Sequence, residues 1–127
     1  MKKLLVLCAV LLLSSVIAYA GQKILTAQWE QTLPNPNDLQ GWKLYYSTTQ
    51  GGPYTLLKTI PFVSQQTTYT DEFQFTSPDG QRKQYFFVLT AIDTSGNESG
   101  YSNEASIWID FEAPGVPVNL RITIKVQ

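Results

Sequence analysis

Hydrophobic and polar side chains alternate along most of the chain after residue 21, and this is the period of a β-strand with one buried face. Helical spacing is nearly absent from the same region. Clusters rich in Pro, Gly, Asn and Asp separate the alternating runs and are typical of turns. The pattern predicts an all-β protein with strands at Leu25–Trp29, Trp42–Tyr46, Tyr54–Ile60, Thr67–Phe75, Tyr85–Ala91 and Glu104–Ile109.

The first twenty residues have the pattern of a secretory signal peptide. Lys2 and Lys3 form a basic start, and Leu4–Leu13 is an unbroken apolar run. Residues 18–20 (Ala-Tyr-Ala) form a cleavage site of the A-x-A type before Gly21. The apolar run is shorter than the roughly 20 residues that a membrane span needs. The sequence therefore predicts cleavage and a secreted, periplasmic or cell-surface protein without a membrane span. Retention as an uncleaved anchor is the alternative.

The composition excludes several classes of function. The chain contains no histidine, which is the commonest general base and the commonest transition-metal ligand. Its single cysteine, Cys8, lies in the signal segment, so the expected mature protein has no disulfide. Loss of Lys2 and Lys3 changes the net charge from −1 to −3 and leaves no basic run for nucleic acid. We expect no catalytic activity, no cofactor, no metal site and no nucleic-acid partner.

One acidic loop has a superficial likeness to a catalytic motif. Residues 93–96 (Asp-Thr-Ser-Gly) have the order of an aspartic-protease loop, but that chemistry needs two carboxylates that share a proton. No second loop of this kind is present. Asp93, Asn97 and Glu98 also lack the spacing of a complete calcium loop. The sequence favours a turn here.

Four motifs between Ile24 and Ile109 resemble those of fibronectin type III modules. They are a tryptophan that ends the second strand, an aromatic-x-aliphatic-x-aromatic third strand, a Tyr-x-aliphatic-x-aliphatic-x-Ala sixth strand, and the G-x-x-S…S loop after it. The matches are Trp29, Trp42-x-Leu44-x-Tyr46, Tyr85-x-Phe87-x-Leu89-x-Ala91 and Gly96–Ser102. The resemblance implies an immunoglobulin-like antiparallel β-sandwich of about seven strands over residues 21–110. It further implies a non-catalytic module that acts through protein contacts, in which Tyr85 ties the preceding loop to the sandwich.

The two ends of the chain depart from this family. Type III modules begin with a strand announced by prolines and Asn-Leu, but only Gly21–Lys23 precede the second strand here. The missing pattern is found instead at Pro114–Arg121. The chain then continues as an amphipathic strand. Its apolar positions are Val118, Leu120, Ile122, Ile124 and Val126. Residues 111–127 are thus predicted to be a proline-containing linker followed by a β-strand.

An amphipathic strand without a neighbour leaves its apolar face and its backbone unpaired, so it should seek a sheet edge. Three outcomes are open. The strand could fold back beside Leu25–Trp29 of its own module. It could fill the first-strand position of another copy, in which case the protein assembles with itself. It could also be an unpaired remnant of a second module.

A second candidate surface follows from the same alternation. If Leu44, Phe87 and Ile107 point inward, their neighbours on the central strands point outward and form one aromatic stripe, a common kind of protein-binding site. These outward residues are Tyr45, Phe86, Val88 and Trp108. Two alternatives to a binding site remain: these residues are scattered surface aromatics, or a loop or the tail (residues 111–127) covers them. The runner-up function is carbohydrate binding, with Tyr45 and Trp108 as stacking platforms.

Overall fold

The computed structural model describes residues 22–77 and 80–126, and the expected signal peptide with its cleavage site lies outside these residues. The six strands predicted between Leu25 and Ile109 are present, whereas the strand predicted within residues 111–127 is not formed among the described residues. Their bounds are β1 (Gln22–Trp29), β2 (Leu39–Ser47), β3 (Thr55–Pro61), β4 (Tyr69–Thr76), β5 (Arg82–Asp93) and β6 (Ala105–Asp110). Among the described residues there is no helix that is both long enough and apolar enough to cross a membrane.

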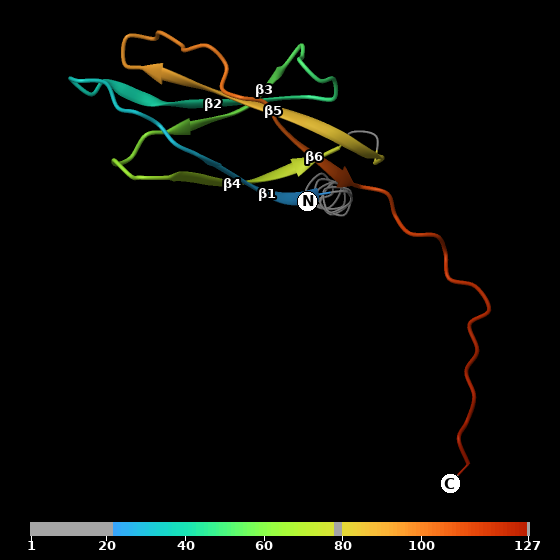
Figure 1. Cartoon of the computed structure of the whole chain (residues 1–127). Coiled ribbons are helices and arrows are strands. Elements are labelled where there is room, and N and C mark those ends of the chain that lie inside the picture. Colours follow the sequence, from blue (N-terminus) through green and yellow to red (C-terminus); the bar gives the residue numbers. More distant parts are fainter. Residues whose placement is uncertain (1–21, 78–79, 127) are drawn as a thin grey trace, which may run out of the picture.

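The strands form two antiparallel sheets, with the orders β1-β4 and β3-β2-β5-β6, and the sheets lie face to face (Figure 1). The predicted antiparallel sandwich is therefore confirmed. The described residues contain six strands, whereas the resemblance implied about seven. No described strand precedes β1, and the two-stranded sheet ends at β1 within the described part of the chain.

The core between the sheets consists mainly of aromatic side chains from alternate positions. Trp42 on β2 packs against Tyr69 on β4 with ring centroids 4.8 Å apart, and Phe75 packs against Tyr85 at 4.9 Å. The burial along β4 alternates between buried and exposed from Phe73 onward, as one covered face requires. Large aromatic rings bury much apolar area each, which lets a domain of this size hold together without disulfides.

The role that the resemblance implies for Tyr85 is confirmed. Its ring is 2% exposed, and its hydroxyl lies 3.0 Å from the Ser77 hydroxyl in the loop before β5. This hydrogen bond ties the loop to the sandwich.

The loop after β5 begins with the turn that the sequence favours. The Asp93 carboxylate accepts hydrogen bonds from the backbone N–H groups of Ser95 (3.0 Å) and Asn97 (2.8 Å). The Asn97 side-chain amide donates a third bond to it at 2.9 Å. These bonds, the Asn97 side-chain bond foremost, lower the pKa of Asp93. The carboxylate serves as an internal acceptor that shapes the turn.

Beyond β6 the chain leaves the sandwich. Phe111 is still buried in the core, at 8% exposure, and the Glu112 N–H donates to the Asp110 carboxylate. From there the chain runs away from both sheets, and no strand is assigned between residues 111 and 126 (Figure 1). The apolar side chains from Val118 to Val126 are 79–91% exposed. The first of the three open outcomes, folding back beside β1 of the same copy, is not what the structure shows.

Candidate functional site

The exposed edge of β1 is the most prominent unsatisfied feature of the sandwich. Within the described residues β1 pairs with β4 only, over its full length from Gln22 to Trp29. In an antiparallel pair every second residue directs its N–H and C=O away from the partner strand. One side of β1 therefore presents a row of backbone donors and acceptors that is ready to pair with another strand.

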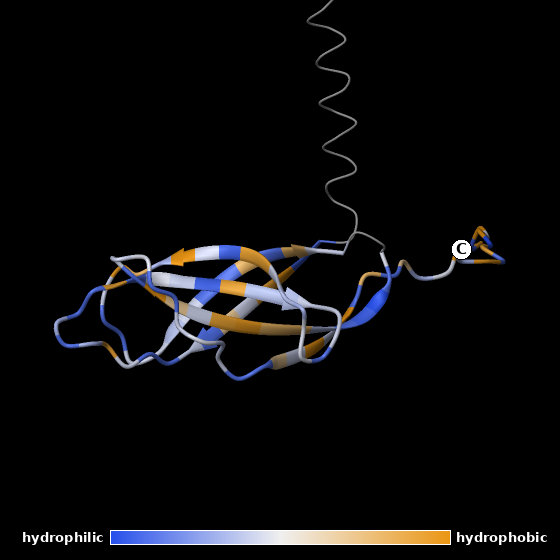
Figure 2. Cartoon of the chain, turned by 90° about the horizontal axis from the view of Figure 1, so that it is seen from above, coloured by the Kyte–Doolittle hydropathy of each residue, from blue (hydrophilic) through white to orange (hydrophobic). Residues whose placement is uncertain are grey.

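A groove of about 770 Å³ runs along this edge. One wall is residues 25–31 of β1 and the turn after it, and the other wall is the segment 99–107. Core side chains lie at its base, among them Trp42, Leu44 and Phe87. We call this feature the β1 groove. It combines an unpaired strand edge with apolar surface from the inside of the sandwich. Figure 2 shows hydrophobic and hydrophilic residues alternating along the strands.

Burial confirms that the sandwich is open on this side. The inward residues of β4, such as Phe73 and Phe75, are at most 9% exposed. The inward residues of β1, such as Leu25 and Trp29, are only half-buried although they pack against the same core. The difference arises because β4 is covered by the opposite sheet, whereas β1 borders the groove.

The same contrast occurs within β6. Ile107 pairs with the inward-facing Tyr85, yet it is 46% exposed and lines the β1 groove. Ile109, two residues later on the same face, is 5% exposed. The prediction that Ile107 points inward thus holds for its direction but not for its burial, because no strand covers it.

The two tryptophans that line the β1 groove, Trp29 at the end of β1 and Trp42 on β2, differ in their hydrogen bonding. The Trp42 indole N–H donates to the Gln31 side-chain oxygen at 3.0 Å. The Trp29 indole N–H is buried and meets no acceptor among the described residues. A buried donor without an acceptor costs free energy. An additional acceptor brought close to Trp29 would lower that cost.

The second wall of the β1 groove is held by two serines of the predicted family loop. The backbone N–H of Ala91 donates to the Ser99 hydroxyl, and that of Leu89 donates to the Ser102 hydroxyl, both at 2.9 Å. In return, the N–H groups of Ser99 and Ser102 donate to the carbonyls of Ala91 and Leu89, both at 2.8 Å. The two serines thus form hydrogen bonds with the backbone groups of β5 that have no partner on β6.

The predicted aromatic stripe does not form an exposed surface. Phe86 and Val88 are buried, at 8% and 3% exposure, and they lie outside the main core cluster because they face away from the other sheet. The loop after β5 covers this outer face (Figure 1). The expectation that both residues are available to a partner is wrong for that reason. Cover by a loop was the alternative that the sequence left open.

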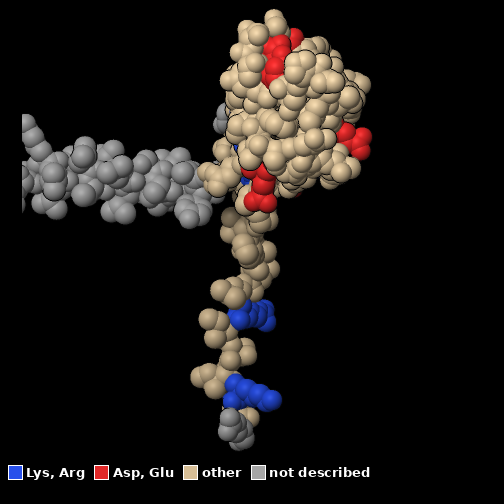
Figure 3. Space-filling model, turned by 90° about the vertical axis from the view of Figure 1, so that its left-hand side faces the viewer, with Lys and Arg blue, Asp and Glu red and all other residues tan. Residues whose placement is uncertain are grey.

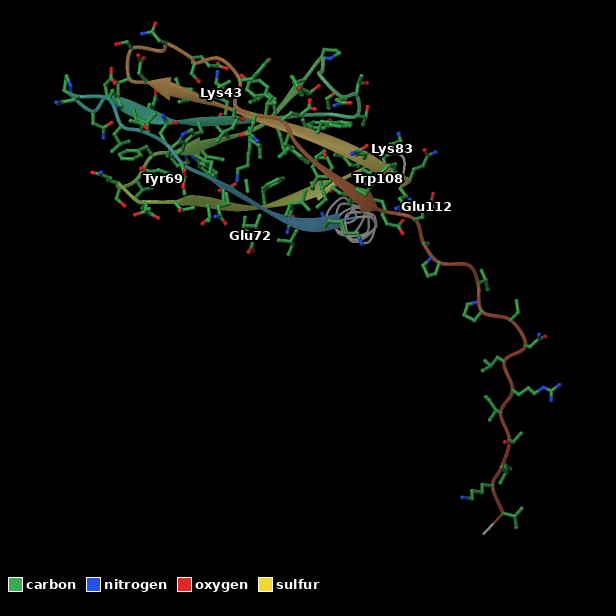
Figure 4. The ribbon with its side chains drawn as sticks, in the orientation of Figure 1. Lys43, Tyr69, Glu72, Lys83, Trp108 and Glu112 are labelled. Atoms are coloured by element: carbon green, nitrogen blue, oxygen red, sulfur yellow. The ribbon has the colours of Figure 1, made fainter. Side chains whose placement is uncertain are left out.

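Glu98 fixes the covering loop to the outer face. Its carboxylate accepts hydrogen bonds from the hydroxyls of Tyr45 (2.5 Å) and Thr90 (3.0 Å), and it pairs with the Lys43 ammonium at 3.2 Å. The bond from Tyr45 is the leading cause that lowers the pKa of Glu98. Burial, and then the same bond, raise the pKa of Tyr45. Lys43 is labelled in Figure 4 on this side of the sheet.

Tyr101 and Glu104 complete the cover. The Tyr101 ring contacts those of Tyr45 and Tyr54 with centroids 5.6 and 5.1 Å apart. The Glu104 carboxylate accepts from the Tyr54 hydroxyl and, at 2.8 Å, from the N–H of Gly51. The bond to Glu104 raises the pKa of Tyr54 to about 12. The sequence reasoning missed this cluster. The signal available for it was the large tyrosine and the two glutamates in a loop of otherwise small residues.

Of the four stripe residues, only Trp108 has a largely free side chain. It is 56% exposed, and the Arg82 guanidinium lies 4.8 Å from its ring centroid. Figure 4 places it near the end of β6, where the chain leaves the sandwich. Tyr45 is half-buried and its hydroxyl is engaged by Glu98. Of the four stripe residues, Trp108 is therefore exposed, whereas Tyr45, Phe86 and Val88 are buried or half-buried.

The comparisons with known proteins concern the fold. No protein-family model and no curated protein matches the sequence. Among solved structures, the chain is similar to one described as a Fn3-like protein from Clostridium thermocellum. The identity is 29%, the match covers 64% of this chain and 73% of that chain, and the TM-score is 0.41. The order and pairing of β1 to β6 show on their own that the protein has a fibronectin type III-like fold.

Proposed function

We propose that this protein is a non-catalytic, secreted or envelope-associated interaction module that binds an extended protein strand in the β1 groove. One observation carries the proposal: the unpaired edge of β1 and the open apolar face of the sandwich lie side by side. Strand addition uses both features. Backbone hydrogen bonds supply affinity, and the side chains at alternate positions supply specificity.

The groove accepts a strand of defined chemistry. β1 offers eight residues for pairing, and the base of the groove is apolar at Leu44 and Phe87. A strand beside β1 would direct every second side chain toward this base and the others toward solvent. The ligand is therefore an alternating apolar and polar segment of about eight residues. Such a segment occurs in the chain itself at residues 118–126.

The proposal can be tested with a peptide that copies residues 116–127. The receiving protein is the chain from Gly21 with Ile122→Asp and Ile124→Asp, which remove the apolar face of its own tail. It also carries Trp108→Phe, which leaves Trp29 and Trp42 as the only tryptophans, and both line the groove. We expect a saturable change in tryptophan fluorescence on titration with the peptide.

Two controls make the peptide experiment decisive. A peptide with aspartate at the positions of Ile122 and Ile124 should not bind. Ala27→Arg places a long charged side chain in the groove from the inward face of β1, and it should abolish binding while circular dichroism shows the sandwich intact. Absence of binding, or unchanged binding to the Ala27→Arg protein, would reject the β1 groove as a strand site.

The proposed location rests on the signal-like first twenty residues. We expect the intact mass of the exported protein to correspond to a chain that begins at Gly21. A product that retains Met1 would show an anchored protein instead.

Carbohydrate binding has one observation in its favour, the exposed Trp108 ring beside Arg82. The second candidate platform, Tyr45, is half-buried, and its hydroxyl is bound to Glu98. The strand-binding proposal has the stronger support for this reason. Specific glycan-array signals that vanish in Trp108→Ala would favour the carbohydrate function.

A further inference from the structure

We propose that the strand bound in the β1 groove is the C-terminal segment of a second copy, so that copies assemble head to tail. The inference rests on the proposed function of the groove and names its partner. The C-terminal segment, residues 118–126, carries five apolar side chains at alternate positions, and all five are at least 79% exposed. A continuous row of exposed apolar residues on an extended chain is suited to burial against a sheet edge.

The C-terminal segment matches the groove in length. Asn119 has a φ of 58°, in the left-handed region that asparagine tolerates, so the uninterrupted extended run begins at Leu120. From Leu120 to Val126 it presents seven residues to the eight of β1. Pro114 and Pro117 lie in the linker, where the lack of an N–H prevents regular pairing. Pairing is therefore confined to the part of the tail that alternates.

The direction of the chain favours a neighbouring copy over the same copy. β6 ends and β1 begins at the same end of the sandwich (Figure 1). A strand antiparallel to β1 must start at the other end. Because Phe111 is buried, only residues 112–117 are free to connect.

The length of this connection excludes an antiparallel strand beside β1 of the same copy. From Phe111 to Val118 the chain spans at most about 25 Å at roughly 3.5 Å per residue. The eight residues of β1 already extend over about 24 Å at roughly 3.4 Å per residue. The connection cannot both return along the sandwich and reverse direction at its far end. In a second copy stacked beyond the end of β6, the tail enters the groove antiparallel to β1 without any reversal.

The charges of the two parts are complementary. All ten acidic residues precede residue 113, whereas the charged residues after that point are Arg121 and Lys125 (Figure 3). Both basic residues occupy the polar positions of the C-terminal segment. When the apolar positions face the groove, Arg121 and Lys125 lie on the outer side of the two-stranded sheet. Glu72 of β4 lies on that outer side, as Figure 4 shows.

Each copy then has one tail and one β1 groove, which are different surfaces. A contact between different surfaces is heterologous, and it repeats until a ring closes or a filament forms. The expected assembly is a linear series of sandwiches in which each tail supplies the missing first strand of the next copy.

Cysteine cross-linking tests this inference. The chain from Gly21 has no cysteine, so introduced pairs are unambiguous. Ala27→Cys places a thiol on the inward face of β1, and Ile122→Cys or Ile124→Cys places one on the apolar face of the tail. Cross-strand neighbours come close enough for a disulfide. We expect mild oxidation to give a ladder of linked dimers, trimers and higher species on a non-reducing gel.

The matched control is Ala27→Cys with Thr123→Cys, because Thr123 lies on the opposite face of the same tail. We expect this control to give at least about fivefold less disulfide-linked protein than the pairs on the apolar face. A disulfide that forms within single copies, or a ladder no stronger than this control, would overturn head-to-tail assembly. If the peptide binds the groove but no ladder forms, strand binding survives and self-assembly fails. If the peptide does not bind, both fail.

Discussion

At the scale of single residues, Tyr85 connects the core, the loop before β5 and the start of the tail. Its ring packs against Phe75 at 4.9 Å and against Phe111 at 6.1 Å, and its hydroxyl bonds to Ser77. Because Phe111 is the last buried residue before the linker, the packing around Tyr85 also fixes the point from which the tail departs.

We expect Tyr85→Phe to lower the free energy of unfolding by about 1 kcal/mol, because it removes a buried hydrogen bond while keeping the ring. Urea denaturation measures the change. Tyr46→Phe is the matched control, since no described residue bonds to the Tyr46 hydroxyl, and its effect should stay within about 0.5 kcal/mol. Equal losses in both variants would show that the bond to Ser77 does not stabilise the fold.

Glu98 gives the covering loop a dependence on pH. Its folded-state pKa is lowered, first by the Tyr45 hydroxyl, so the carboxylate stabilises the fold above its unfolded pKa of about 4.3. That stabilisation is lost as the pH falls through the lower, folded-state pKa. We expect Glu98→Gln to be less stable than the wild type at pH 7, with a gap that closes below about pH 4. A gap that is constant from pH 3 to pH 7 would contradict the role of the carboxylate charge.

At the scale of elements, β6 has one end in the core and the other end at the β1 groove. Ile109 is enclosed between the sheets, whereas Ile107 faces the groove and remains 46% exposed. Under the proposed function, Ile109 of this strand contributes to folding and Ile107 contributes to binding.

This difference predicts that replacement by alanine lowers the free energy of unfolding by different amounts at the two positions. Ile109→Ala should lower the free energy of unfolding by roughly 2–5 kcal/mol, the range for replacing a buried Leu, Ile or Met by Ala. Ile107→Ala should cost less than about 1 kcal/mol in dilute protein. Ile107→Ala should nevertheless weaken peptide binding, because the occupant would cover that side chain. Comparable losses of stability in the two variants would mean that the groove is closed in solution.

The elements themselves could be predicted from the sequence, because alternation is a local property that each strand carries. The six strands were accessible in this way. The Asp93 turn was accessible from the composition of its loop, and the role of Tyr85 from the resemblance to type III modules. Alternation gives the direction of a side chain but not what covers it. Phe86 and Val88 point outward as predicted, yet both are buried, on the face of the sheet where Glu98 and Tyr101 contact Tyr45.

The need for glycine at position 41 was likewise hidden from the sequence. A Cβ there would lie 2.2 Å from the Ile60 carbonyl oxygen on the neighbouring strand β3. Only the pairing of β2 with β3 reveals this close approach. The β1 groove could be predicted from the sequence only in part. The sequence predicted an open edge at β1, but the groove's second wall depends on how Ser99 and Ser102 bond to β5.

At the scale of the whole molecule, the described residues form a sandwich with an open edge at β1 and an exposed, alternating segment at residues 118–126. An exposed sheet edge favours association with other chains. In the head-to-tail assembly that we propose, each C-terminal segment completes the sandwich of the next copy. Because each proposed insertion covers the open side of a core, we expect binding to stabilise the receiving copy by mass action.

Sedimentation velocity over a range of protein concentrations tests this account most directly, with the chain from Gly21 and two charge-matched variants. We expect the mean mass of the wild type to rise with concentration. Ile124→Asp, on the apolar face of the tail, should remain monomeric throughout, and Thr123→Asp, on the polar face, should still assemble. A wild type that stays monomeric at every concentration, or an Ile124→Asp protein that assembles equally well, would contradict head-to-tail insertion of the tail into the β1 groove.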